Sequence, residues 1–316
     1  MAQPSPSLMS ATAILFPREA PRAWQTKHAE AEALVTSRAL PGFDKRAALA
    51  FLHRILMPRS LRWSYLVVGK TGSSSVLMAL HGLEFGQPLS TRTDSASLNS
   101  DAIGHHLTHA GLLRQLIEIG PPDPLLNKTL RLTSTRHPAE RMISAWIYVC
   151  SANRQAHADF LQERLLMTIL TGLDWDRHAG TPEGFARFLD FLLMAEDPVQ
   201  GIILDLHLLP MHQVIRPELY RPHLVVRVEE MAAALTRLAE QLGRPAPQAA
   251  PRANCQPDYD AASYLQSPGI AAHLERLCAE DCRMFGYHPD PMAPLLDLPD
   301  LLSEAKVALS DKGTGA

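Results

Sequence analysis

The stretch VVGKTGSSSVLMAL, residues 67 to 80, places a glycine- and hydroxyl-rich turn between two apolar runs. The first run predicts a short strand over 64–69, and the second predicts a helix over 74–82. A strand that leads through such a turn into a helix is typical of the βα units from which parallel sheets are built. The stretch therefore indicates an α/β fold in which helices cover a parallel sheet.

The rest of the chain continues this alternation of short strands and amphipathic helices. Further strands are predicted at 129–135 and 223–228. Helices are predicted from apolar residues at helical spacing, at 44–57, 110–119, 139–150, 157–171, 182–195, 200–206, 229–242 and 268–283. Proline-rich ends bound these elements, so we expect an irregular segment over 1–25, a single α/β domain over 26–288 and a C-terminal tail over 289–316.

Composition narrows the class of protein. The chain has 316 residues and a formal net charge of −3, which gives no electrostatic case for binding nucleic acid. No apolar run approaches the roughly 18 residues that span a bilayer, and no signal peptide is recognised, so we expect a cytoplasmic protein. The four cysteines form no C-x-x-C pair and are expected to be thiols rather than zinc ligands; they are Cys150, Cys255, Cys278 and Cys282.

The turn carries groups suited to an anion. A complete Walker A loop has a further glycine five residues before Gly69, where this chain has Ser64. The phosphate-binding groups are therefore expected after that glycine, where N–H groups and the helix dipole favour an anion. These groups are Lys70, Thr71, Gly72, Ser73, Ser74 and Ser75. The alternative is that Ser73 or Ser74 only caps the helix while Lys70 is solvated.

A second cluster follows the strand at 129–135. In RHPAERMIS, residues 136–144, Arg136 ends the strand and Ser144 lies on the helix that Pro138 begins. Open α/β sheets bind ligands at the carboxyl ends of their strands, and a planar guanidinium suits a phosphate. The alternative is an ion pair of Arg136 or Arg141 with Glu140 on a solvated face.

Together, GKTGSSS and RHPAERMIS resemble the two phosphate-binding segments of sulfotransferases that use 3′-phosphoadenosine-5′-phosphosulfate (PAPS), specifically the membrane-type carbohydrate sulfotransferase family. Members carry PK-[TS]-G-[ST]-[ST]-S and R-[DN]-P-x-x-R-x-x-S segments. Three further stretches are similar to family elements, namely DLHLLP at 205–210, LVVRVEEM at 224–231 and IAAHLERLCAEDCRMFGYH at 270–288. The resemblance covers about residues 60 to 288 and implies a P-loop-like three-layer fold with a central parallel sheet flanked by helices.

The chain departs from the family pattern at several places. Gly69 stands where the family usually has proline, and His137 where it has Asp or Asn. The paired cysteines that follow the D-x-H-x-x-P element in animal members, and their N-terminal membrane anchor, have no counterpart here. These differences suggest a cytoplasmic relative from a bacterium.

The resemblance implies transfer of a sulfuryl group from PAPS, as co-substrate, to a hydroxyl of a carbohydrate or glycolipid. Lys70 would neutralise the charge that develops on the bridging oxygen, and residues 71–75 would hold the 5′-phosphate. Arg136 and Ser144 would hold the 3′-phosphate. No metal is implied, and the sequence does not define the oligomeric state.

The acceptor hydroxyl must lose its proton as it attacks, which calls for a base. In heparan-type members the base is a histidine between the two PAPS segments, and IGHHLTHAGLL at 103–113 offers His105 and His106, with His109 close by. One comparison with the family favours His105 and another favours His106. His207 and His212 are alternative bases or acceptor contacts.

Two other functions are weighed against sulfuryl transfer. A P-loop kinase or nucleotide hydrolase is disfavoured because position 64 is not glycine and no strand ends in an aspartate for Mg²⁺. A non-catalytic nucleotide-binding member is disfavoured by the retained Lys70, Arg136 and Ser144. Residues proposed to contact the sugar or donor on weaker grounds are Trp63, Trp146, Trp175, Arg252 and Asn254.

Overall fold

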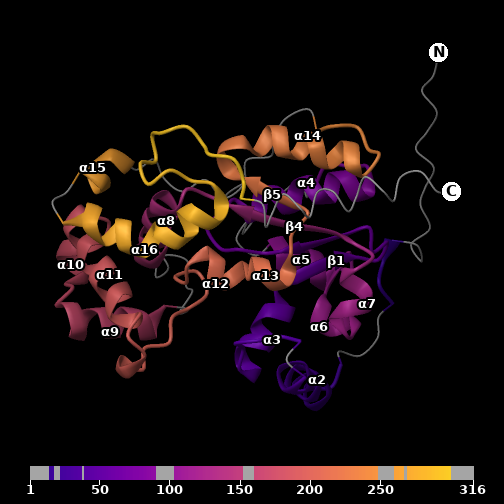
Figure 1. The fold of residues 1–316 in the computed structure, drawn as a ribbon, viewed down its shortest axis with the longest axis horizontal. Coiled ribbons are helices and arrows are strands. Elements are labelled where there is room, and N and C mark those ends of the chain that lie inside the picture. The colour runs from indigo at the N-terminus through magenta and orange to yellow at the C-terminus, as the bar shows by residue number, and fades with distance from the viewer. Residues whose placement is uncertain are drawn as a thin grey trace.

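The computed structural model describes residues 14–17, 22–37, 39–89, 103–151, 160–247, 260–266 and 269–299. Within these ranges, the strands form a five-stranded sheet of order β3-β1-β2-β4-β5 (Figure 1). They are β1 (Ile55–Pro58), β2 (Trp63–Leu66), β3 (Leu113–Gln115), β4 (Leu130–Thr135) and β5 (Leu224–Arg227). β2, β4 and β5 pair in parallel, as the sequence predicts, whereas β1 pairs antiparallel with both β2 and β3.

The strand register brings several chain segments to one edge of the sheet. Leu66 of β2 pairs with Thr133 of β4, and Thr135 of β4 pairs with Arg227 of β5. The carboxyl ends of the three parallel strands therefore lie together. Ile55, the first residue of β1, also pairs with Leu66 and adds the start of β1 to this edge. The carboxyl edge of such a sheet is where α/β proteins bind ligands.

Helices cover both faces of the sheet and complete a three-layer α/β fold (Figure 1). Successive strand residues point to opposite faces, so Tyr65 and Val226 join one apolar cluster while Leu66 and Val225 join the other. The first cluster includes α4 (Ser73–Phe85) and α14 (Met231–Gln241), which lie above the sheet in Figure 1. The second includes α3 (Lys45–His53), α8 (Pro138–Ser151), α11 (Pro182–Ala195) and α16 (Ile270–Phe285).

The remaining helices connect these layers. They are α2 (Trp24–Thr36), α5 (Ile103–His109), α6 (Leu116–Ile119), α7 (Pro122–Leu126), α9 (Leu161–Thr171), α10 (Trp175–His178), α12 (Met211–Ile215), α13 (Pro217–Tyr220) and α15 (Ala261–Leu265), with 3₁₀ turns η3 (Pro198–Gln200) and η4 (Val228–Glu230). Helices predicted at 74–82, 139–150, 157–171, 182–195, 229–242 and 268–283 are confirmed with small shifts of their ends.

Three of the predicted helices are wrong in part or in whole. The helix expected over 44–57 ends at His53, and 55–58 form β1, whose residues are all buried. The helix expected over 110–119 is replaced by a turn at 110–112, by β3 and by α6, because Gly111 adopts a φ of 73° and turns the chain. The helix expected over 200–206 does not form, since η3 ends at Gln200 and its C-cap, Gly201, has a φ of 62°. A short buried apolar run fits a strand or a helix equally well by periodicity.

The predicted division of the chain at 25/26 and 288/289 stays a prediction. α2 begins at Trp24, just inside the segment expected to be irregular, and Arg22 before it forms an ion pair with Glu30. At the other end, 289–299 run without helix or strand, and the N–H of Leu296 donates to the carbonyl of Gly286 at 3.0 Å.

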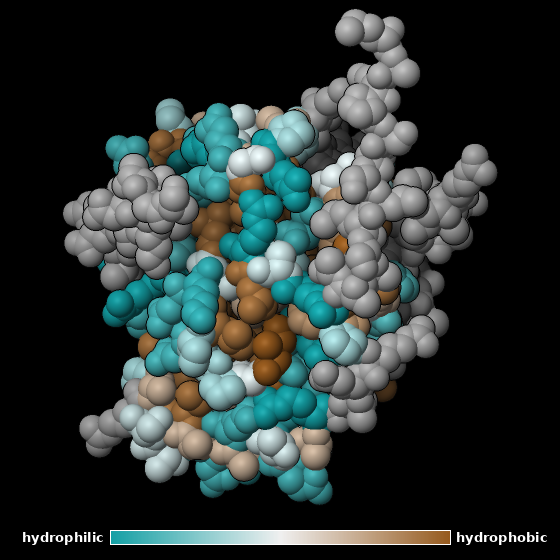
Figure 2. Space-filling view, turned by 90° about the vertical axis from the view of Figure 1, so that its right-hand side faces the viewer, coloured by the Kyte–Doolittle hydropathy of each residue, from teal (hydrophilic) through white to brown (hydrophobic). Residues whose placement is uncertain are grey.

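Surface and cysteines follow ordinary patterns. Across the described part of the chain, no helix is long and apolar enough to cross a membrane. Figure 2 shows a central strip of apolar residues between hydrophilic ones on the face at the right of Figure 1.

Cys150, Cys278 and Cys282 are free thiols, and burial raises the pKa of Cys282 to about 11. Cys255 lies outside the described residues.

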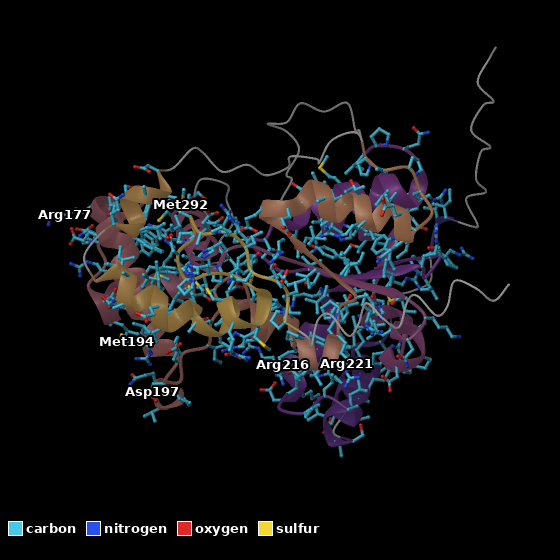
Figure 3. The ribbon with its side chains drawn as sticks, turned by 45° about the horizontal axis from the view of Figure 1, so that its top comes forward. Arg177, Met194, Asp197, Arg216, Arg221 and Met292 are labelled. Atoms are coloured by element: carbon cyan, nitrogen blue, oxygen red, sulfur yellow. The ribbon has the colours of Figure 1, made fainter. Side chains whose placement is uncertain are left out.

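The short helix α13 fastens the two central parallel strands to each other. Arg216 and Arg221, which lie below the sheet in Figure 3, flank it with left-handed φ values of 49° and 47°. This turn buries Tyr220, whose hydroxyl donates to the carbonyls of Ser64 at 3.0 Å and of Leu132 at 3.1 Å. The phenol of Tyr220 therefore links β2 to β4 from the face of the sheet opposite α4.

Replacing Tyr220 with Phe tests that role. The change leaves the ring in place but removes the partner of two buried carbonyls, so we expect unfolding to become easier by about 1–3 kcal/mol. Urea denaturation measures the loss. As a control, Thr236→Ala removes an exposed hydroxyl from α14 and should change stability by less than about 0.5 kcal/mol. Equal effects of the two substitutions would contradict the assignment.

Candidate active site

The turn between β2 and α4 is longer than the sequence pattern indicates. β2 ends at Leu66, not at 69, so residues 67–72 form the turn. Lys70 and Gly72 both take left-handed backbone conformations, with φ of 66° and 68°. Thr71, between them, is buried, and its hydroxyl donates to the Val68 carbonyl at 2.9 Å and lies 2.7 Å from Ser134 Oγ. These bonds hold the turn against the end of β4.

The backbone conformation at the start of α4 favours glycine at position 72. Its φ of 68° is strained for a residue with a Cβ, and such a Cβ would lie 2.9 Å from Cε of Met231, the end of a flexible side chain that can move aside. As the N-cap it has no side chain to accept from the first-turn N–H groups, which belong to Ser73, Ser74 and Ser75. Such a helix start, beside a lysine, fits the phosphate chemistry that the sequence predicts. Anion binding by these residues stays a prediction.

One face of α8 lies against this turn. Arg141, Ser144 and Tyr148 occupy positions i, i+3 and i+7 and so share that face. Nζ of Lys70 lies 3.1 Å from the centroid of the Tyr148 ring, a cation–π contact. Ser144 is buried between Arg141 and Tyr148. Of this face, the sequence pattern singled out Ser144 as a ligand contact, and Tyr148 was missed although its spacing from Arg141 could have revealed it.

Arg141 is fully buried and does not pair with Glu140. Its Nε donates to the Gly69 carbonyl at 3.0 Å and its Nη2 to the His207 carbonyl at 3.2 Å. Burial lowers the pKa of this guanidinium. Arg141 therefore connects α8 to the turn that carries Lys70 and to the segment 205–210.

Arg136 follows β4 at the same edge of the sheet. Its guanidinium makes an ion pair with Glu140 at 3.0 Å, and both side chains are partly exposed. This is the alternative weighed from the sequence, now seen for Arg136 and not for Arg141. A phosphate at this position would compete with Glu140 for the guanidinium, or share it.

The other motif residues hold the edge together. Glu229, after β5, accepts from the backbone N–H of His137 at 2.7 Å and from the Tyr287 hydroxyl at 3.1 Å. His137 also places its Nε2 2.8 Å from the His288 carbonyl oxygen. Three stretches that are far apart in sequence thus meet at the start of α8.

Asp281 of α16 has a similar structural part. The carboxylate is buried and accepts from the backbone N–H groups of Met211 at 2.7 Å and His212 at 2.8 Å. It therefore caps α12, whose own N-cap residue, Pro210, offers no side-chain acceptor. Nδ1 of His212 lies 2.7 Å from the same carboxylate, so this imidazole belongs to the cap.

His207, in the segment 205–210, lies directly on the turn. A Cβ added to Gly69 would lie 2.5 Å from Cδ2 of His207, so only glycine leaves room for this ring position. Nδ1 of His207 lies 2.6 Å from Oδ1 of Asp205. Phe160 and Tyr148 pack around the ring, with centroid separations of 5.8 Å and 5.5 Å.

The histidines predicted to act as the base lie on α5. His105, His106 and His109 are exposed, and the rings of His105 and His109 are 6.4 Å apart. Burial and then the charge of His105 lower the pKa of His53, which places His105 near the start of β1. Across the described part of the chain, neither His105 nor His106 makes a hydrogen bond to the turn at 67–72.

The tryptophans proposed to stack on sugar rings are largely core residues. Trp63 is buried and its Nε1 donates to Glu84 at 2.9 Å. Trp146 is also buried, 5.6 Å from Phe188 and 5.8 Å from Trp175. Arg252 and Asn254 lie outside the described residues, and among those described no group of three metal-ligating side chains occurs.

The turn after β2 and the cationic residue after β4 thus lie together at the carboxyl edge of the parallel strands, where α/β proteins bind ligands. The family model described as the sulfotransferase family matches residues 53–288, and the chain belongs to this family. No curated protein and no solved structure matches the chain. Family membership makes the protein a transferase of sulfuryl groups. It favours this reaction over the kinase alternative.

Two substitutions at position 70 test the backbone of the turn. Lys70→Ala and Lys70→Gly both remove the ammonium group and its contact with Tyr148. Both variants must adopt the left-handed φ of 66°, but only alanine has a Cβ that makes this conformation sterically costly. We expect the alanine variant to be less stable than the glycine variant by about 1 kcal/mol, as measured by urea denaturation. An alanine variant at least as stable as the glycine variant would show that the turn does not hold this conformation.

Proposed function

We propose that the protein transfers a sulfuryl group from PAPS to a hydroxyl of a carbohydrate or glycolipid acceptor. The observation that carries the proposal is the juxtaposition, at one sheet edge, of the Lys70–Gly72 turn after β2 and Arg136 after β4. PAPS has a charged group at each end of its ribose, and these two sites offer cationic and N–H donors from neighbouring strands. Membership of the sulfotransferase family supports the same reaction.

The residues of the turn would bind the sulfated end of the donor. The first-turn N–H groups of α4, at Ser73, Ser74 and Ser75, would hold the 5′-phosphate together with the backbone of Thr71 and Gly72. Lys70 would place its ammonium where negative charge develops on the leaving oxygen. The hydroxyl of Thr71 already bonds within the protein, so its expected contribution is structural.

Arg136 and Ser144 would bind the 3′-phosphate. The planar guanidinium of Arg136 can hold two phosphate oxygens at once, which fixes the orientation as well as the affinity. Bound PAPS supplies the activated sulfuryl group, and the chain supplies orientation and charge neutralisation. No metal ion is needed in this scheme, since cationic side chains and N–H groups do the neutralising.

The identity of the acceptor is inferred from the sequence alone. A carbohydrate or glycolipid acceptor, a cytoplasmic location and a bacterial origin are proposals that the resemblance supports. The same resemblance would give the acceptor's proton to His105 or His106. A non-catalytic member of the family remains the alternative that turnover assays decide.

Substitutions at two neighbouring residues should change the affinity for the donor nucleotide in opposite directions. Arg136→Ala should weaken binding of adenosine 3′,5′-bisphosphate by about 2–4 kcal/mol, because it leaves the 3′-phosphate without its partner. Glu140→Gln removes a competing carboxylate and should tighten binding about two- to fivefold. Isothermal titration calorimetry measures both effects.

Arg283→Ala is the control, because Arg283 forms an ion pair with Glu280 on the exposed side of α16 and its replacement should leave binding unchanged. A preference of the wild-type chain for ATP with Mg²⁺ over the bisphosphate would argue for a kinase instead. Unchanged affinity in Arg136→Ala would remove Arg136 from the donor site.

Turnover tests Lys70 separately from binding. Lys70→Ala should abolish release of adenosine 3′,5′-bisphosphate from PAPS in the presence of a panel of alkyl glycosides, because it removes the ammonium group proposed to neutralise the leaving oxygen. Chromatography of the nucleotide products measures the rate. Persistence of more than a tenth of the wild-type rate would assign that role to another residue.

A further inference from the structure

Asp205 determines which nitrogen of His207 carries the proton. Its Oδ1 accepts from the backbone N–H of His207 at 2.8 Å and lies 2.6 Å from the ring Nδ1. Burial acts to raise the pKa of Asp205, but the hydrogen bond and charge of His207 and nearby backbone N–H groups lower it overall. An ionised carboxylate has no proton to give, so Nδ1 is the donor. The lone pair of the neutral ring then resides on Nε2.

The Cδ2 edge of this ring faces the turn that carries Lys70, and Nε2 adjoins that edge. A Cβ built on Gly69 would lie 3.3 Å from Nε2 of His207, which puts that side of the imidazole against the residue preceding Lys70. Tyr148 packs against both His207 and Lys70. The centroid of its ring lies 5.5 Å from that of the His207 ring and 3.1 Å from Nζ of Lys70. The His207 side chain keeps 40% of its surface exposed, so a ligand can reach it.

We propose that His207 is the general base for the acceptor hydroxyl and that Asp205 is its positioning residue. This assignment rests on the proposed function and replaces His105 and His106 in that role. A base must come within hydrogen-bond reach of the proton that it removes, and it must offer a lone pair there. His207 meets the second condition through Asp205 and lies on the turn where the sulfuryl group would be held.

The proton and the electron pairs are accounted for as follows. The acceptor oxygen gives its proton to Nε2 of His207 while it forms its bond to sulfur. The bond from sulfur to the bridging oxygen breaks, and its electron pair stays on the 5′-phosphate of adenosine 3′,5′-bisphosphate, where Lys70 is placed to neutralise it. The imidazolium donates through Nδ1 to Asp205, and it later releases its extra proton to water.

Charged groups on several elements surround this pair. Lys70 reaches Tyr148 from the turn, and Arg141 donates to the His207 carbonyl from α8. On the Asp205 side, the carboxylate interacts electrostatically with Arg54 and with Glu163 of α9. Burial, followed by the nearby Asp205 charge, raises the pKa of Glu163. A pH profile of the reaction would contain contributions from all of these groups, so the state of His207 must be observed directly.

The first measurement is ¹⁵N NMR of the full chain with labelled histidine, using His207→Gln to assign the signals. We expect His207 near neutral pH to carry its proton on Nδ1, with Nε2 unprotonated, and Asp205→Asn to abolish this preference. A proton fixed on Nε2, or an imidazolium throughout the neutral range, would overturn the proposal because Nε2 could then accept nothing.

The second measurement is single-turnover release of adenosine 3′,5′-bisphosphate from PAPS with octyl β-glucoside as the acceptor probe, and with water alone. His207→Gln and His207→Asn should lower the rate by about 10²- to 10⁴-fold, the usual contribution of a general base. Affinity for the bisphosphate should stay within about twofold of wild type, which also shows that the variants fold.

His212→Gln is the matched control, since His212 pairs with Asp281 in the same manner but as part of a helix cap. It should keep the wild-type rate. A wild-type rate in the His207 variants, with loss in a His105 or His106 variant, would overturn the assignment. A wild-type chain that binds no bisphosphate would instead count against the proposed function itself.

Discussion

The buried guanidinium of Arg141 is the contact on which the site depends. It binds the carbonyl of Gly69 and the carbonyl of His207, and so joins two segments separated by more than half of the sheet-forming chain. A fully buried cation is costly to desolvate, and its pKa is lowered accordingly. The charge of Asp281 acts in the opposite direction, and the carbonyls of Gly69 and His207 accept from the guanidinium. One side chain therefore holds the turn of Lys70 and the segment of His207 together.

Motif residues that look alike in the sequence divide into two kinds in space. Glu229, Asp281 and Tyr287 use their polar atoms to satisfy backbone groups and one another, and they hold the carboxyl edge together. Lys70, Arg136 and His207 leave part of their side chains open to solvent at or beside that edge. The first kind explains why motifs spread along the chain occur together, because each supports a segment that another motif supplies. The second kind is where chemistry can take place.

The βα units could be predicted from sequence because their signals are local. An apolar run, a glycine turn and an amphipathic run identify β2 and α4, and an apolar run followed by Pro138 and an amphipathic run identifies β4 and α8. β1 could not be predicted, since Ile55 to Met57 are apolar on both sides and continue the pattern of α3. Only pairing with β2 and β3 decides that they form a strand.

Site contacts show the same limit. Lys70 and Arg136 stand in motifs, whereas the contact of His207 with Gly69 joins residues far apart in the chain and leaves no local pattern. The absent side chain at Gly69 also has a meaning for comparisons among relatives. An imidazole in this rotamer and a Cβ at position 69 exclude each other, so the two positions form a sterically coupled pair. Relatives that carry proline there would therefore need to hold the histidine of their D-x-H-x-x-P element in another orientation.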